Sequence, residues 1–178
     1  MNGRGTAIKA RRFGPHGRPE GQAFTVNSLA GGTKRYPNVA RLPNDSIVVV
    51  WTDTSTGDSE VRFKRFDASG APLDGGDVLA NVSRAGRQAA LGLVSNDRGD
   101  FLVGYDDAHG CESGCGGEIS KGRVFDLTGV PYAATELTFP SSNTSFLEGV
   151  AVGDGTFRIL NLGIGQPTML LRQVNIQE

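Results

Sequence analysis

Residues 46–72 read SIVVVWTDTSTGDSEVRFKRFDASGAP, and this stretch decides the fold class. Its apolar run at 47–51 is typical of a strand that is buried on both faces. Residues 60–67 instead alternate apolar and basic side chains and lead into a Gly-x-Pro turn, which predicts a solvent-facing outer strand. Asp, Gly and Ser residues between the two segments favour a turn. The stretch therefore predicts neighbouring antiparallel strands of a β-sheet.

The end of this stretch is repeated along the chain. Phe13, Phe66, Phe125 and Val174 mark corresponding positions, spaced by 53, 59 and 49 residues. Four short alternating segments fill each period and predict strands. They lie at 24–28, 37–42, 46–52 and 60–67, then at 77–82, 88–95, 100–106 and 118–126, and finally at 135–139, 146–152, 156–162 and 167–175. One extra outer-type strand is expected at 7–13.

Four antiparallel strands in each unit of about fifty residues are typical of propeller blades. We expect an all-β, β-propeller-like chain of about three four-stranded blades plus an extra N-terminal outer strand. The single repeat domain, 1–178, would comprise the extra strand and turn at 1–23 and blades at 24–76, 77–133 and 134–178. The alternative is a β-sandwich or an open stacked sheet. Because three blades leave unpaired edges, we expect self-association or neighbouring blades of a longer chain.

Composition excludes several classes of protein. The chain has 26 glycines and 8 prolines in 178 residues, which argues against a helical bundle. A formal net charge of −1 gives no electrostatic footprint for a nucleic-acid partner. The longest apolar run is far shorter than the ~20 residues of a membrane-spanning helix. The first residues lack the apolar core of a signal peptide, so we expect either a cytoplasmic chain or numbering that begins inside a mature protein or a fragment.

Three segments of the first unit resemble a repeat found in tandem in large bacterial secreted and cell-surface proteins. They are Val26-Asn27, the stretch 37–51 with its VVVW ending, and RFDASGAP at 65–72. In those repeats VN opens the unit, P-x-VA-x-L-x-DG-x-x-VVVW fills its middle and RFDASGxP closes it. The match is specific in the first unit, partial in the second and weak in the third. The resemblance implies a β-propeller-like fold, an extracellular or cell-surface location, a binding or scaffolding role and no catalytic residues.

Cys111 and Cys115 lie four residues apart in a Gly-rich insertion. We expect a local disulfide, since such a loop brings two cysteines within bonding distance and an extracellular location would maintain the bond. Two free thiols are one alternative. A zinc site with His109 as a third ligand is another, although zinc takes four ligands and the spacing matches no recognised zinc knuckle.

Acidic residues follow the third strands of the first two units. Asp53, Asp58 and Asp106 supply the carboxylate oxygens that calcium prefers, so calcium is the one cofactor that the sequence suggests. The ordered pattern of an EF-hand is absent. Aspartates that hydrogen-bond their own turn are the commoner interpretation.

Catalysis is not expected. A glycoside-active enzyme, the distant alternative, needs two facing carboxylates, but Asp45, Asp100 and Asp154 recur in turns whose geometry requires them. The sequence has no nucleophile elbow, no metalloprotease motif and no phosphate-binding glycine loop. Its two histidines, His16 and His109, offer little general-base chemistry.

Aromatic residues provide the candidate ligand site. Trp51, Tyr105 and Tyr36 can stack on sugars, although packing between blades is the ordinary role of the first two. The N-terminal quarter is basic and could meet an anionic polysaccharide, or its charges could protect a sheet edge. These basic residues are Lys9, Arg11, Arg12, Arg18, Lys34 and Arg35. We expect a noncatalytic, extracellular binding or adhesion module for a glycan or cell-surface ligand, and the alternative is a structural repeat that forms a surface filament or spacer.

Overall fold

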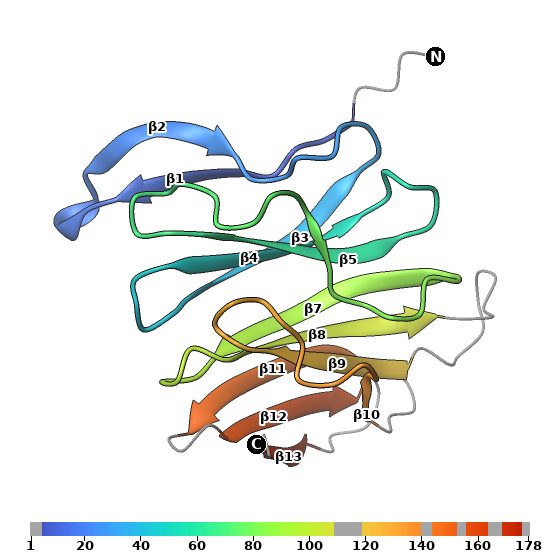
Figure 1. Cartoon of the computed structure of the whole chain (residues 1–178). Helices are drawn as coiled ribbons and strands as arrows, with labels where there is room; N and C mark the ends of the chain where they lie inside the picture. The colour runs from blue at the N-terminus through green and yellow to red at the C-terminus, as the bar shows by residue number, and fades with distance from the viewer. Residues whose placement is uncertain (1–4, 109–118, 140–143, 153–155, 164–168, 176–178) are drawn as a thin grey trace.

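The computed structural model describes residues 5–108, 119–139, 144–152, 156–163 and 169–175 (Figure 1). Within these residues the chain forms thirteen β-strands and one short 3-10 turn, η1 (Pro15–Gly17), and it contains no α-helix. Each strand coincides with, or lies beside, a segment whose alternation predicts one. The all-β expectation is therefore confirmed.

Antiparallel pairing sorts the strands into four sheets. The N-terminal hairpin consists of β1 (Lys9–Phe13) and β2 (Pro19–Thr25). The first four-stranded sheet has the order β3 (Lys34–Arg41), β4 (Ile47–Asp53), β5 (Glu60–Phe66) and β6 (Val78–Leu79). The second has the order β7 (Arg87–Ser95), β8 (Phe101–Ala108), β9 (Ile119–Phe125) and β10 (Leu137–Phe139). The C-terminal sheet contains β11 (Thr144–Val152), β12 (Thr156–Gly163) and β13 (Met169–Asn175).

The grouping of strands differs from the repeat units that the sequence predicts. The segment at 77–82 is expected to open the second unit, but β6 pairs with β5 and completes the first four-stranded sheet. The cause is the Gly-x-Pro turn after β5, which reverses the chain so that the N–H of Leu73 donates to the carbonyl of Arg65 at 2.9 Å. The same reversal follows β9, where Tyr132 donates to Val124 at 3.1 Å and β10 becomes the fourth strand.

The sheets are stacked in chain order, with the N-terminal hairpin at one end and the C-terminal sheet at the other (Figure 1). The first strands of successive sheets, β3, β7 and β11, lie next to one another. An aromatic core fills the space between the two four-stranded sheets, where the ring of Phe63 lies 4.8 Å from that of Phe125 and 5.3 Å from that of Phe101. This packing fixes the relative position of β3 and β7.

The solvent-facing position predicted for β5 is wrong. All seven of its residues are buried, and Arg62, Lys64 and Arg65 are each only 8% exposed. The strand lies between β4 and β6, and two of its basic side chains reach residues outside its own sheet. Lys64 donates to the hydroxyl of Ser28 at 2.6 Å, and Arg65 donates to the carbonyl of Leu127 at 2.7 Å. Two of the three basic residues of this strand therefore make contacts beyond their own sheet.

Candidate ligand-binding groove

Two of the three predicted sugar-stacking rings are fully buried. Trp51 packs between the first four-stranded sheet and the N-terminal hairpin, and its indole N–H donates to Asp53 Oδ2 at 3.3 Å. Tyr105 packs in the aromatic core, and its hydroxyl donates to Glu136 Oε1 at 2.6 Å. Burial and this hydrogen bond raise the pKa of Tyr105. Neither ring presents a face to a ligand, so both residues serve packing in this structure.

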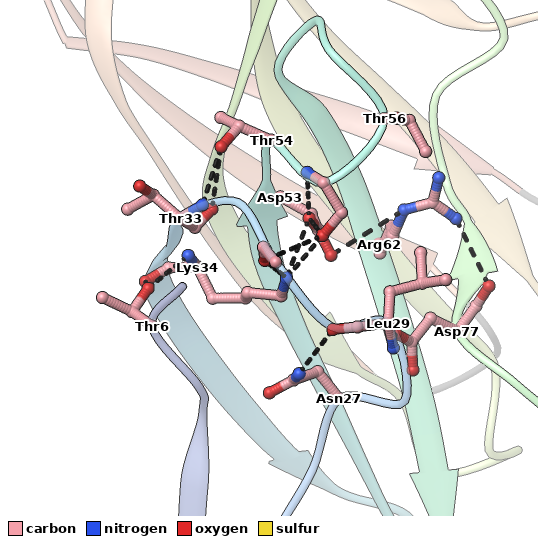
Figure 2. Close-up of polar contacts among 12 residues, drawn as sticks. Thr6, Asn27, Leu29, Thr33, Lys34, Asp53, Thr54, Thr56, Arg62 and Asp77 are labelled. Carbon is pink, nitrogen blue, oxygen red and sulfur yellow. Dashed lines mark hydrogen bonds and ion pairs between the residues drawn. The ribbon is translucent and has the colours of Figure 1, made fainter. Parts of the chain in front are cut away.

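Asp53 belongs to a buried charge cluster (Figure 2). Its Oδ1 lies 3.4 Å from Lys34 Nζ, and its Oδ2 lies 4.0 Å from Arg62 Nε. Burial raises the pKa of Asp53, but hydrogen bonds from Ser55 and Trp51 and the charge of Lys34 outweigh burial and lower the pKa below its usual range. The carboxylate is thus occupied by donors of the protein itself.

The other two predicted calcium ligands lie apart from Asp53. Asp58 is exposed in the turn between β4 and β5. Asp106 is buried on β8 in the next sheet and accepts a hydrogen bond from Ser120 Oγ at 3.0 Å. Among the described residues, no group of three or more His, Cys, Asp or Glu side chains could hold a metal ion. The structure therefore does not assemble the calcium site that these residues suggest.

The remaining candidate site residues lie in or beside turns, or outside the residues that the structure describes. Asp45 adopts a φ of 63° in the turn between β3 and β4. Asp100 is buried just before β8, where it accepts a hydrogen bond from the hydroxyl of Tyr132 at 2.7 Å. This hydrogen bond and burial raise the pKa of Tyr132 to about 12. His109, Cys111, Cys115 and Asp154 lie outside the described residues.

A groove of about 620 Å³ opens between β3 and β7. This volume is within the range of small-molecule binding sites, roughly 300–1,000 Å³. The groove combines an aromatic ring, apolar side chains, hydroxyl groups, an amide and two guanidinium groups. Its lining residues are Thr33, Arg35, Tyr36, Pro37, Asn38, Thr52, Thr54, Ser59, Arg87, Ala89, Ala90 and Leu91.

Irregular strand pairing shapes the groove. The register of β3 shifts between Arg35 and Asn38, and the register of β7 shifts between Ala90 and Gly92. Such bulges interrupt pairing and redirect side chains. Within the β3 bulge, Pro37 has no N–H to donate, and Tyr36 adopts a φ of 54° in the left-handed region that side-chain-bearing residues rarely occupy. Tyr36 is consequently 59% exposed on the groove wall.

Hydrogen bonds between the sheets hold the floor of the groove in place. Thr52 on β4 accepts a hydrogen bond from the N–H of Ala90 on β7 at 2.9 Å. Ser59 donates to the carbonyl of Gln88 at 2.6 Å. Because these contacts join β7 to β4 and to the turn after β4, they hold the sheet that contains β3 against β7. A groove whose walls are held in this way has a reduced ordering cost of binding.

The sequence predicts part of this site. Tyr36, a candidate stacking residue, and Arg35, a member of the basic N-terminal quarter, both line the groove. Arg87 and Ser59 were missed because no local pattern shows that β7 lies against β3. The signal for Tyr36 was its aromatic ring, which can stack on a sugar, and the signal for Arg35 was the cluster of basic residues in the N-terminal quarter.

No protein-family model matches the chain, and no curated protein matches it either. In the described part of the chain, no helix has the length and apolar character needed to cross a membrane.

Proposed function

We propose that this protein is a noncatalytic binding or adhesion module, located outside the cell or at its surface, that binds a carbohydrate in the groove between β3 and β7. The observation that carries this proposal is the exposed ring of Tyr36 on a left-handed backbone in the groove wall. Such backbone strain costs about 1–3 kcal/mol and is concentrated at functional sites. The ring offers a flat apolar face and a polar hydroxyl, the combination suited to a sugar ring.

The chemistry around Tyr36 supports a polar, ring-shaped ligand. Pro37, Ala89 and Leu91 supply apolar contact surface. Asn38 and Thr33 add an amide and a hydroxyl, which can exchange hydrogen bonds with sugar hydroxyl groups. Sites for small ligands combine this kind of apolar lining with a few polar groups that fix orientation.

The proposal includes a propeller-like arrangement of the sheets. In a propeller, the blades surround a central channel and each blade is a four-stranded sheet. Two features support this arrangement: the adjacent first strands β3, β7 and β11, and the short fourth strands β6 and β10. The outermost sheets would then meet blades of a second copy or of a longer chain. Light scattering tests self-association, which predicts a particle mass that is a multiple of 18.7 kDa, whereas a monomer at every concentration contradicts it.

A structural spacer or filament repeat is the second candidate, and a repeated contact favours it. Asp77, just before β6, accepts hydrogen bonds from the N–H groups of Ser28 and Leu29 at 2.7 and 2.8 Å. Glu136, just before β10, accepts equivalent bonds from Val82 and Ser83 at 2.6 and 3.2 Å. The same carboxylate contact therefore fixes two successive sheet junctions, as a rigid spacer requires.

A glycan array distinguishes the two candidates. A binding module should give saturable signals that Tyr36→Ala weakens by about tenfold or more, because removing one good aromatic contact costs on the order of 1.4 kcal/mol. Phe13→Ala is the matched control, since Phe13 is 60% exposed at the end of β1 and does not line the groove. Failure of the wild-type protein to bind any glycan would contradict the binding function and favour the second candidate, the structural spacer.

A further inference from the structure

We infer that the groove selects acidic saccharides, with Arg35 of β3 and Arg87 of β7 binding a carboxylate or sulfate group on the sugar. This inference rests on the proposed carbohydrate-binding function and adds the chemical class of the ligand. Both arginines are exposed residues that line the groove, one from each of the two strands that form its walls.

The charge of the groove is of one sign. No Asp or Glu is found among the described residues that line it. Asp53 follows Thr52, a lining residue, but successive side chains of a strand point to opposite faces, and Asp53 contacts Lys34 on the other face. Glu60 is neutralised by Arg62 and by Arg84, whose Nη2 lies 2.6 Å from Glu60 Oε1. Asp58 is exposed and does not line the groove.

Arg35 is the better placed of the two cations. Its side chain has no hydrogen-bond or ion-pair partner within the described part of the chain. A guanidinium group remains charged at physiological pH, and its planar fork of N–H donors matches the two oxygens of a carboxylate or sulfate. An unpaired arginine beside an exposed aromatic ring therefore favours a ligand that carries both an acidic group and a ring.

The size and lining of the groove argue for a saccharide over a free anion. A small ion contacting Arg35 would leave most of the 620 Å³ volume empty. It would also leave Tyr36, Pro37 and Leu91 without contacts. An acidic oligosaccharide uses both parts of the site, because its sugar rings cover the apolar lining while its acidic group meets the arginines.

Isothermal titration calorimetry with matched probes tests the inference. The probes are tetragalacturonate, the neutral tetrasaccharide obtained by reducing its carboxylates, and a sulfated κ-carrageenan tetrasaccharide. The last carries sulfate groups and no carboxylate, so it separates sulfate from carboxylate recognition. We expect at least one acidic probe to bind about tenfold or more tightly than the neutral one, since a hydrogen bond to a charged group is worth roughly 1.5–3 kcal/mol. Arg35→Gln and Arg87→Gln should each reduce this preference, because they lower the affinity for the acidic probe more than the affinity for the neutral probe.

Three controls make the result decisive. Arg18→Gln removes the same charge from the exposed N-terminal hairpin and should change nothing. Arg35→Lys and Arg87→Lys keep the positive charge but lose the planar fork of N–H donors. Their preference for the acidic probe should therefore lie between those of the wild type and the glutamine variants. They also replace a glutamine variant in the test if that variant does not fold. Tyr36→Ala should weaken neutral and acidic probes equally.

The outcomes separate this inference from the function on which it rests. Equal binding of neutral and acidic probes by the wild-type protein overturns the acidic preference and leaves carbohydrate binding intact. An equal loss in Arg18→Gln shows nonspecific attraction and also overturns the inference. Absence of binding to all three probes, together with an array that shows no bound glycan, contradicts the proposed function as well.

Discussion

Glu136 accepts a hydrogen bond from the backbone N–H of Val82 at 2.6 Å, although the two residues are 54 positions apart in the chain. The contact joins the segment after β6 to the residue that precedes β10. The hydroxyl of Tyr105 and the ammonium group of Lys121 also donate to the same carboxylate, at 2.6 and 2.9 Å. One side chain therefore links the two four-stranded sheets.

Replacing Glu136 by glutamine should destabilise the fold by about 2 kcal/mol at pH 7, the cost of weakening charge-assisted hydrogen bonds at a largely buried site. Burial raises the pKa of Glu136, but donors from Tyr105, Lys121 and two backbone N–H groups lower it below the usual value of 4.5. Because the folded pKa is the lower one, the carboxylate stabilises the protein above the unfolded pKa, and this stabilisation is lost as pH falls through the folded pKa.

Urea denaturation of wild type and Glu136→Gln at pH 7 and in acid measures this effect. The difference in unfolding free energy should be largest at neutral pH and should shrink below about pH 4, near the unfolded carboxyl pKa. Glu20→Gln is the control, because Glu20 forms only a half-exposed ion pair with Arg12 and should contribute less than about 1 kcal/mol. A difference that stays constant with pH would contradict the assignment.

The strands could be predicted from sequence, but their grouping could not. Local alternation identified the segment at 100–106, where the structure has β8, because side-chain period and turn residues are short-range signals. Val78–Leu79 belong to the sheet of β5 because a Gly-x-Pro turn reverses the chain. The alternation of apolar and polar residues along a strand gives no information about this reversal. Charge alone likewise could not show that Lys64 contacts Ser28, in the segment between β2 and β3.

Some residues of the candidate site could likewise be predicted from sequence, and others could not. Tyr36 could be found because an aromatic ring is a general candidate for stacking on a sugar. Arg87 could not, since its place in the groove results from the packing of β7 against β3. Trp51 and Tyr105 occupy corresponding positions, each two residues before the aspartate opposite Lys34 or Gln88, and their burial follows from the sheets stacked on both sides of their strands.

Lys34 and Gln88 occupy corresponding positions in the two four-stranded sheets, and this predicts which substitution Lys34 tolerates. Lys34 lies opposite Asp53 across β3 and β4, as Gln88 lies opposite Asp107 across β7 and β8. Gln88 Nε2 donates to Asp107 Oδ1 at 3.1 Å. Lys34→Gln should therefore keep a donor to Asp53 and cost about 1 kcal/mol.

Lys34→Met should cost about 3 kcal/mol, because it removes a partner from a buried carboxylate and supplies no hydrogen-bond donor. Urea denaturation of the two variants gives the comparison, with methionine and glutamine matched in length. Equal losses of unfolding free energy in the two variants would contradict the prediction that a glutamine at position 34 donates to Asp53 as Gln88 donates to Asp107.

Alanine substitutions at Gly70 and Gly129 measure how much the contact between Arg65 and the turn after β9 constrains the fold. Both glycines lie in Gly-x-Pro turns with a positive φ, 90° and 81°. A side chain at either position meets similar backbone strain, about 1–2 kcal/mol. A Cβ at 129 would also lie 2.9 Å from Nε of Arg65, whereas one at 70 would have its nearest neighbour 4.0 Å away, at Arg12.

Gly129→Ala should therefore be more destabilising than Gly70→Ala by about 1–3 kcal/mol, the usual cost of overpacking. Arg65 cannot move away freely, because it pairs with Asp74 and donates to the carbonyl of Leu127. Thermal unfolding of both alanine variants measures the difference. If the two variants lost equal stability, the contact of Arg65 with the turn after β9 would not constrain the fold.

The oxidation state of Cys111 and Cys115 tests the proposed extracellular location. They lie outside the described residues, so their disulfide stays a prediction from sequence. A bridge across so few residues should stabilise the fold only slightly, since even a ~15-residue loop contributes about 3 kcal/mol, and thermal unfolding should therefore change little after reduction. Mass spectrometry of protein purified without reductant and treated with an alkylating agent should find no alkylated cysteine before reduction and two afterwards. Two alkylated thiols before reduction would remove both the bridge and the main compositional support for an extracellular location.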